Sequence, residues 1–150
     1  MKKLNLFLLL MAFSFGLFAA PVSLESARSV ADNYYSHNSA KSNTAVSDVL
    51  TYQKDGVNTF YIFIYQAGGF VIVSADDAVI PILGCSTNEP FDKNNIPVNA
   101  ANWFDQYSTQ IKHIVDANLS NKATLKEWNK IRNNYFFSGY FRWRTCGYNL

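Results

Sequence analysis

The chain has 150 residues, of which 13 are Lys or Arg and 11 are Asp or Glu, so its net charge at pH 7 is +2. Two of the basic residues and none of the acidic ones fall within the first 20 residues, so the remainder carries no net charge. This balance argues against a nucleic-acid partner, for which a basic surface is expected. The length after residue 20 suits one compact domain.

Residues 1–20 have the pattern of an export signal. Lys2-Lys3 form a basic start, an apolar run follows to Phe18, and Ala19-Ala20 supply the small residues of a cleavage site. The run is shorter than the about 20 residues that cross a bilayer, and no second such run follows. We therefore expect a secreted or periplasmic protein with no integral membrane segment after signal removal. A retained N-terminal anchor is the alternative.

A first helix is predicted after Ser23, whose hydroxyl suits an N-cap. Leu24, Ala27, Ala31 and Tyr34 recur at spacings of three and four, which predicts an apolar stripe facing a core. The pattern ends in the polar residues 36–39.

The next segment changes to the period of strands. Asp55-Gly56 is a strong hairpin signal, and Gly68-Gly69 marks a second tight turn. The strand rich in aromatic residues between these turns is apolar on both faces, which predicts a central position. Four strands joined by short links predict an antiparallel meander over residues 49–52, 59–65, 69–74 and 79–85.

Two more helices are predicted after the sheet. Asn99 is the expected N-cap of the first, whose apolar stripe continues to Val115 and which should end near Asn118. Residues 124–131 predict a shorter third helix. The expected fold class is α+β, with a four-stranded antiparallel meander, an N-terminal helix, and a second helix after the sheet packed on one face. The expected units are 1–20, 21–118 and 119–150, the last a short helix with a basic and aromatic tail.

No set of residues predicts an active site, a cofactor site or a metal site. Cys85 and Cys146 allow a disulfide in an oxidising compartment, while a buried free thiol at Cys85 is the other possibility. Asp76-Asp77 fits a turn better than a catalytic acid pair, because neighbouring side chains usually point apart. No two histidines share a helix face, as a zinc site would need. His113 is expected on the exposed flank of its helix.

One combination of segments is more specific. A Gly-Gly-Phe-Val-Ile-Val-Ser-Ala-Asp-Asp run over residues 68–77 precedes Ile-Leu-Gly-Cys-Ser over 82–86, and Trp103-Phe104 and Tyr107 follow on a helix. Over about residues 22–116 this resembles the propeptide of streptopain-family cysteine peptidases and the related free-standing Spi-type inhibitors. The resemblance implies an exported inhibitor, not an enzyme, that blocks the cleft of a streptopain-type cysteine peptidase without a covalent bond.

In that family, residues near the start of the second helix block the place of the catalytic histidine. The resemblance therefore implies that Asn99 is inhibitory, together with peptidase-contacting residues in the loop before it: Ser86, Thr87, Asn88, Glu89, Phe91 and Asn95. The alternative for Asn99 is a capping role alone. The alternatives for the chain are a truncated propeptide remnant of a peptidase precursor and an exported binding module with no inhibitory activity.

Overall fold

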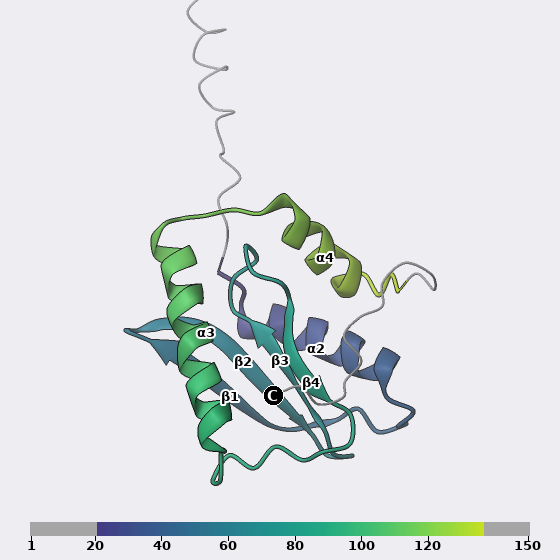
Figure 1. Ribbon diagram of the computed structural model, residues 1–150. Coiled ribbons are helices and arrows are strands. Elements are labelled where there is room, and N and C mark those ends of the chain that lie inside the picture. Colours follow the sequence, from purple (N-terminus) through teal and green to yellow (C-terminus); the bar gives the residue numbers. More distant parts are fainter. Residues whose placement is uncertain (1–20, 137–150) are drawn as a thin grey trace, which may run out of the picture.

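The computed structural model describes residues 21–136. Its elements, in chain order, are α2 (Leu24–Asn38), β1 (Val46–Lys54), β2 (Val57–Tyr65), β3 (Phe70–Ser74), β4 (Ile82–Ser86), α3 (Val98–Asp116) and α4 (Lys122–Arg132). The strands form one antiparallel sheet in the order β1-β2-β3-β4 (Figure 1). The predicted α+β class and four-stranded meander are confirmed. Within residues 21–136 no helix is long and apolar enough to cross a membrane.

The turns that the glycines predicted are present. Asp55 and Gly56 join β1 to β2 with φ angles of 48° and 79°, as the Asp-Gly dipeptide favours. Gly68 and Gly69 join β2 to β3 with φ angles of 86° and 93°. Ser23 caps α2 as expected, because its Oγ accepts a hydrogen bond from the amide of Ser26 at 3.2 Å.

The helices after and before the sheet lie on opposite faces of it, which corrects the expectation of a single covered face. Phe60 and Ile62 of β2 pack toward α3, whereas Tyr61 and Phe63 pack toward α2. Figure 1 shows α3 on the near side of the sheet and α2 behind it. Successive strand side chains point to opposite faces, so a strand that is apolar at nearly every position requires cover on both sides.

The last helix joins the core on the α2 side. Trp128 of α4 is 1% exposed, and its indole N–H donates to the carbonyl of Val79 at 2.8 Å. The hydroxyl of Thr124 donates to the carbonyl of Asp77 at 2.8 Å. Asn33 of α2 donates to the carbonyl of Ile131 at 3.0 Å. These bonds fix α4 to α2 and to the turn that follows β3.

The fourth strand begins later than predicted, because residues 76–81 form a turn. The carboxylate of Asp76 accepts a hydrogen bond from the amide of Ala78 at 2.9 Å, so the predicted turn role of Asp76-Asp77 is confirmed for Asp76. Leu24 was expected to face the core but is 45% exposed, because it lies at the first position of α2, beyond the edge of the sheet.

Cys85 is disulfide-bonded and half-buried in β4 on the α2 side of the sheet. The Tyr34 hydroxyl lies 3.7 Å from its Sγ. The buried free thiol is therefore the wrong alternative for Cys85. Cys146 and most of the basic and aromatic tail lie outside the described residues.

Candidate functional site

The residues singled out from the sequence lie along one connection, from the end of β4 to the first turn of α3. Figure 1 shows this connection crossing the lower end of the sheet. Ser86 closes β4, residues 87–97 form the loop, and Asn99 lies in α3. We call residues 86–97 the β4–α3 loop. The structure thus places the loop residues together and Asn99 at the far end of the same connection.

The middle of the β4–α3 loop is open to solvent. The side chains of Asn88, Glu89 and Asn95 are exposed, while those of Ser86, Thr87 and Phe91 are half-buried. The loop therefore offers a partner polar side chains in its middle and backbone groups at its ends.

Two side chains within the loop fix its backbone into turns. The Oγ of Ser86 accepts hydrogen bonds from the amides of Asn88 at 3.3 Å and Glu89 at 2.9 Å. The carboxylate of Asp92 accepts from the amide of Asn94 at 2.9 Å. Such local bonds are the reason that Ser and Asp favour turns, and they limit the conformations of the loop.

Phe91 anchors the loop on the α3 side of the sheet. Its ring centroid is 5.3 Å from that of Phe70 in β3 and 6.2 Å from that of Phe104 in α3. Ile96 packs against the same core. An aromatic side chain in such contacts buries a large apolar area. Phe91 therefore attaches the loop to the core, while part of its side chain remains exposed.

An ion pair ties the far part of the loop to the sheet. The ammonium group of Lys93 lies 2.6 Å from the carboxylate of Asp48 in β1. The hydrogen bond from Lys93 lowers the pKa of the Asp48 carboxyl, so this carboxyl is charged near neutral pH. The pair is solvent-exposed, and such pairs contribute little stability; it restricts the loop more than it stabilises the fold.

The base of the loop is held by residues that the sequence did not point to. The Nζ of Lys41, in the segment after α2, donates to the carbonyl of Thr87 at 2.6 Å. The same group donates to the carbonyl of Ala67 at 2.6 Å in the β2–β3 turn. Lys41 is 46 residues away from Thr87, and no local pattern marks such a contact.

Asn99 is not the N-cap that the sequence predicted. Pro97 takes that position, and no side chain bonds to the free amides of the first turn of α3. Asn99 is the second residue of α3 and its side chain is exposed, and Val98, the first residue, is 78% exposed. The amide side chain of Asn99 can donate and accept hydrogen bonds, so this end of α3 presents a polar group and an apolar group to solvent.

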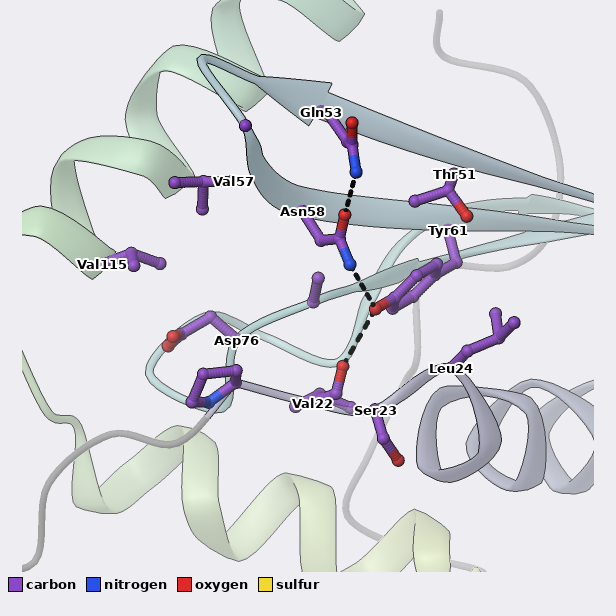
Figure 2. A pocket seen from close by; sticks show the side chains of 13 residues that line it. Val22, Ser23, Leu24, Thr51, Gln53, Val57, Asn58, Tyr61, Asp76 and Val115 are labelled. Carbon is purple, nitrogen blue, oxygen red and sulfur yellow. Dashed lines mark hydrogen bonds between the residues drawn. The ribbon is translucent and has the colours of Figure 1, made fainter.

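A hollow of about 690 Å³ lies at the opposite end of the sheet, beside the Asp55-Gly56 turn. Figure 2 shows Tyr61 at its centre, with its hydroxyl donating to the carbonyl of Val22 at 3.1 Å. Asn58 donates to the same hydroxyl at 3.4 Å and accepts from Gln53 at 2.6 Å. These polar groups satisfy one another, and no residue predicted for the site lines this hollow.

The described residues hold no cluster of three or more His, Cys, Asp or Glu side chains that could bind a metal ion. Asp76 is buried, and this burial raises the pKa of its carboxyl. The hydrogen bond from the amide of Ala78 lowers the same pKa, and the neighbouring charge of Asp77 raises it. His113 is exposed on α3, as predicted.

Comparison with known proteins places this domain, with its two-faced sheet and braced polar loop, among protease-inhibitor and propeptide-like domains. Residues 19–111 match the family described as Spi protease inhibitor. The chain belongs to the Spi protease inhibitor family, since the match covers more than half of its length. Helix α4 lies outside the matched segment.

The curated relatives include streptopains from Streptococcus pyogenes, from its serotype M1 and from its serotype M18 strain MGAS8232. Each is 36% identical over 72 residues, which is 47% of this chain and 18% of the relative. The chain therefore matches less than a fifth of the length of these streptopains. No solved structure gives a significant match.

Proposed function

We propose that this protein is an exported inhibitor of a streptopain-type cysteine peptidase, and that it blocks the active-site cleft without forming a covalent bond. The contacts are made by the β4–α3 loop through Ser86, Thr87, Asn88, Glu89, Phe91 and Asn95, and by Asn99 at the start of α3. The observation that carries this proposal is the loop itself, which exposes polar side chains, is bonded at Thr87 through Lys41 to the β2–β3 turn, and is paired at Lys93 with Asp48 of β1.

A braced loop suits inhibition because binding then orders few additional groups. Association costs about 0.5–1.5 kcal/mol for each long side chain that becomes immobile, and a preformed loop avoids much of this cost. Asn99 offers both a donor and an acceptor to a polar cleft. The uncapped amides of α3 add a positive field at the same place.

Export belongs to the same proposal. Residues 1–20 have the basic, apolar and small-residue regions of a signal peptide, which would deliver the inhibitor to the secreted or periplasmic space. Processing there is checked by N-terminal sequencing of the protein recovered outside the cytoplasm, which should begin near residue 21.

The inhibitory function is tested with purified residues 21–150 and a streptopain-type peptidase. We expect residual peptidase activity to fall to near zero at micromolar inhibitor. The variant Asn99→Trp should weaken inhibition at least about tenfold, a loss typical of an interface contact. Gln110→Trp, on an exposed position further along α3, is the matched control and should inhibit like the unmodified protein. Peptidase activity that is unchanged at micromolar excess would reject the proposal.

The streptopain similarity also fits a propeptide remnant that folds but no longer inhibits. The two functions separate in the assay above, because a remnant folds with the same circular dichroism spectrum and leaves the peptidase active. Reading the genomic DNA after this coding sequence for a peptidase domain in another frame gives independent support for the remnant.

A further inference from the structure

We propose that Lys41 is a positioning residue, which fixes the base of the β4–α3 loop to the β2–β3 turn. The consequence for inhibition depends on the function proposed above, while the structural role does not. Lys41 lies between α2 and β1 and contacts neither the middle of the loop nor Asn99 in the hydrogen bonds of the described structure.

The ammonium group of Lys41 is bonded to three backbone carbonyls on two different segments. It donates to Ala67 at 2.6 Å and to Gly68 at 3.3 Å, both in the β2–β3 turn. It donates to Thr87, the first residue after β4, at 2.6 Å. A lysine ammonium has three donors, so all of its donors bond to these two segments.

The half-buried position of Lys41 makes these bonds strong. Hydrogen bonds from a charged donor are shorter and roughly twice as strong as neutral ones, and the two 2.6 Å distances lie just below the usual range of about 2.7–3.2 Å. The Tyr35 hydroxyl also donates to the carbonyl of Gly68, at 2.5 Å. The β2–β3 turn is thus held by Tyr35, and Lys41 holds Thr87 at a fixed place relative to this turn.

The two segments approach so closely that the lysine can reach both. A Cβ at Gly68 would lie 3.4 Å from the Nζ of Lys41 and 3.4 Å from the carbonyl oxygen of Asn88. These are ordinary contact distances, so the turn, the lysine and the start of the loop pack directly against one another. The turn, the lysine and the start of the loop are in contact with one another, although they come from three separate parts of the sequence.

This arrangement predicts that Lys41 controls the order of the free loop. Without the ammonium, the carbonyl of Thr87 loses this partner, and the loop keeps the contacts of Phe91 and Ile96 with the core and the exposed Lys93 pair. The loop then samples more conformations before binding. A peptidase would have to order it, which weakens affinity mainly through faster dissociation.

The test measures the free protein first. In Lys41→Met, hydrogen exchange of the amides of residues 87–89 and 91–95 should rise about tenfold or more, the factor expected when a charge-assisted hydrogen bond is lost. Lys41→Arg should restore much of the protection, because it keeps charged donors. Lys54→Met is the matched control: Lys54 pairs with Asp105 at 2.7 Å and lies beside the Asp55-Gly56 turn, at the other end of the sheet, so its loss should leave loop exchange unchanged.

The same variants are then assayed as inhibitors. Lys41→Met should weaken inhibition by a factor similar to its gain in loop exchange, with a thermal midpoint close to that of Lys54→Met. Loop exchange that matches the unmodified protein would overturn the positioning role. Raised exchange with unchanged inhibition would overturn its link to the peptidase. If the unmodified protein does not inhibit at all, the proposed function fails while the exchange result still decides the role of Lys41.

A measurement on the unmodified protein covers the case in which Lys41→Met does not fold. A lysine ammonium held by three carbonyls exchanges its protons slowly, so Lys41 should give an observable side-chain ammonium signal in nitrogen-15 NMR near neutral pH. Lys126, exposed on α4, should give none under the same conditions. The absence of a Lys41 signal under these conditions would overturn the proposal.

Discussion

A Cβ atom placed on Gly69 would overlap the carbonyl oxygen of Ser86 and would lie 2.8 Å from the carbonyl carbon of Thr87. The backbone of the β2–β3 turn therefore touches the backbone at the end of β4, and any side chain at Gly69 would force them apart. Gly69 also has a φ of 93°, in a region that L side chains rarely adopt. One glycine thus meets two requirements, and the start of the β4–α3 loop depends on it.

We expect Gly69→Ala to destabilise the protein by about 2–5 kcal/mol, from backbone strain and steric overlap together. Gly56→Ala is the matched comparison, because Gly56 has a φ of 79° but a Cβ placed on it would meet no atom within 4 Å. It should cost about 1–2 kcal/mol from strain alone. Urea unfolding of both variants checks the difference, and equal losses would contradict the close approach.

Asp76 should respond to pH in a defined direction. Burial raises the pKa of its carboxyl, so the folded state favours the neutral form; this contribution to stability is present below the pKa of the unfolded chain and lost as pH rises through the folded pKa. Asp76→Asn keeps an acceptor for the amide of Ala78 and removes the charge. Its melting temperature should therefore exceed that of the unmodified protein near pH 7, with a smaller gap near pH 3.

Asp76→Ala separates the hydrogen bond from the charge. It removes the acceptor of the Ala78 amide, and leaving a buried donor unpaired costs about 1–3 kcal/mol. This variant should melt below Asp76→Asn at pH 7. Identical melting curves for the two variants would show that the turn does not depend on this bond.

Trp128 should be essential for stability although α4 lies outside the family match. Trp128→Ala is expected to cost about 3–5 kcal/mol, a large share of the about 5–15 kcal/mol that holds a domain folded. Trp128→Phe keeps most of the volume and removes the donor to Val79, which should cost about 1–3 kcal/mol.

Lys126→Ala is the control for these two variants, since Lys126 is exposed on the same helix and should change stability by less than about 0.5 kcal/mol. Guanidinium unfolding followed by circular dichroism measures all three. A Trp128→Ala variant as stable as Lys126→Ala would mean that α4 is dispensable for the core.

The disulfide of Cys85 gives a chemical test. The chain has two cysteines, so a bridge within one chain joins Cys85 to Cys146. Peptide mapping without reduction should recover the two cysteine peptides linked, and reduction should lower the free energy of unfolding by about 4 kcal/mol in the chain-entropy model. A Cys85 peptide linked to another copy of itself would contradict the bridge within one chain.

Local signals predicted much of this fold. Asp55-Gly56 carries its own turn geometry, Ser23 caps the helix that follows it, and the apolar spacing from Ala100 to Ile111 marks one face of α3. Each of these features is decided within a few residues of the chain, where turn chemistry and periodicity act.

The features that sequence reasoning missed depend on distant partners. The unbroken apolar run in β2 predicted that both of its faces are apolar, but not that α2 and α3 would cover different ones. The N-cap was assigned to Asn99 because its side chain suits that role, whereas Pro97 precedes the helix. The bond from Lys41 to Thr87 could not be predicted, because it joins residues 46 positions apart and no local pattern marks it. The β4–α3 loop could be located from the sequence, but the residues that hold it could not.

The bond from Asn33 to Ile131 joins residues 98 positions apart, whereas every strand of the meander pairs with the strand next to it in sequence. Contacts that close long stretches of chain have a larger entropic cost and tend to delay folding. The sheet can therefore assemble first from its hairpins, and we expect α4 to dock last. Until α4 docks, it does not cover the Asp77–Val79 turn. At this stage proteolysis or self-association would compete with folding.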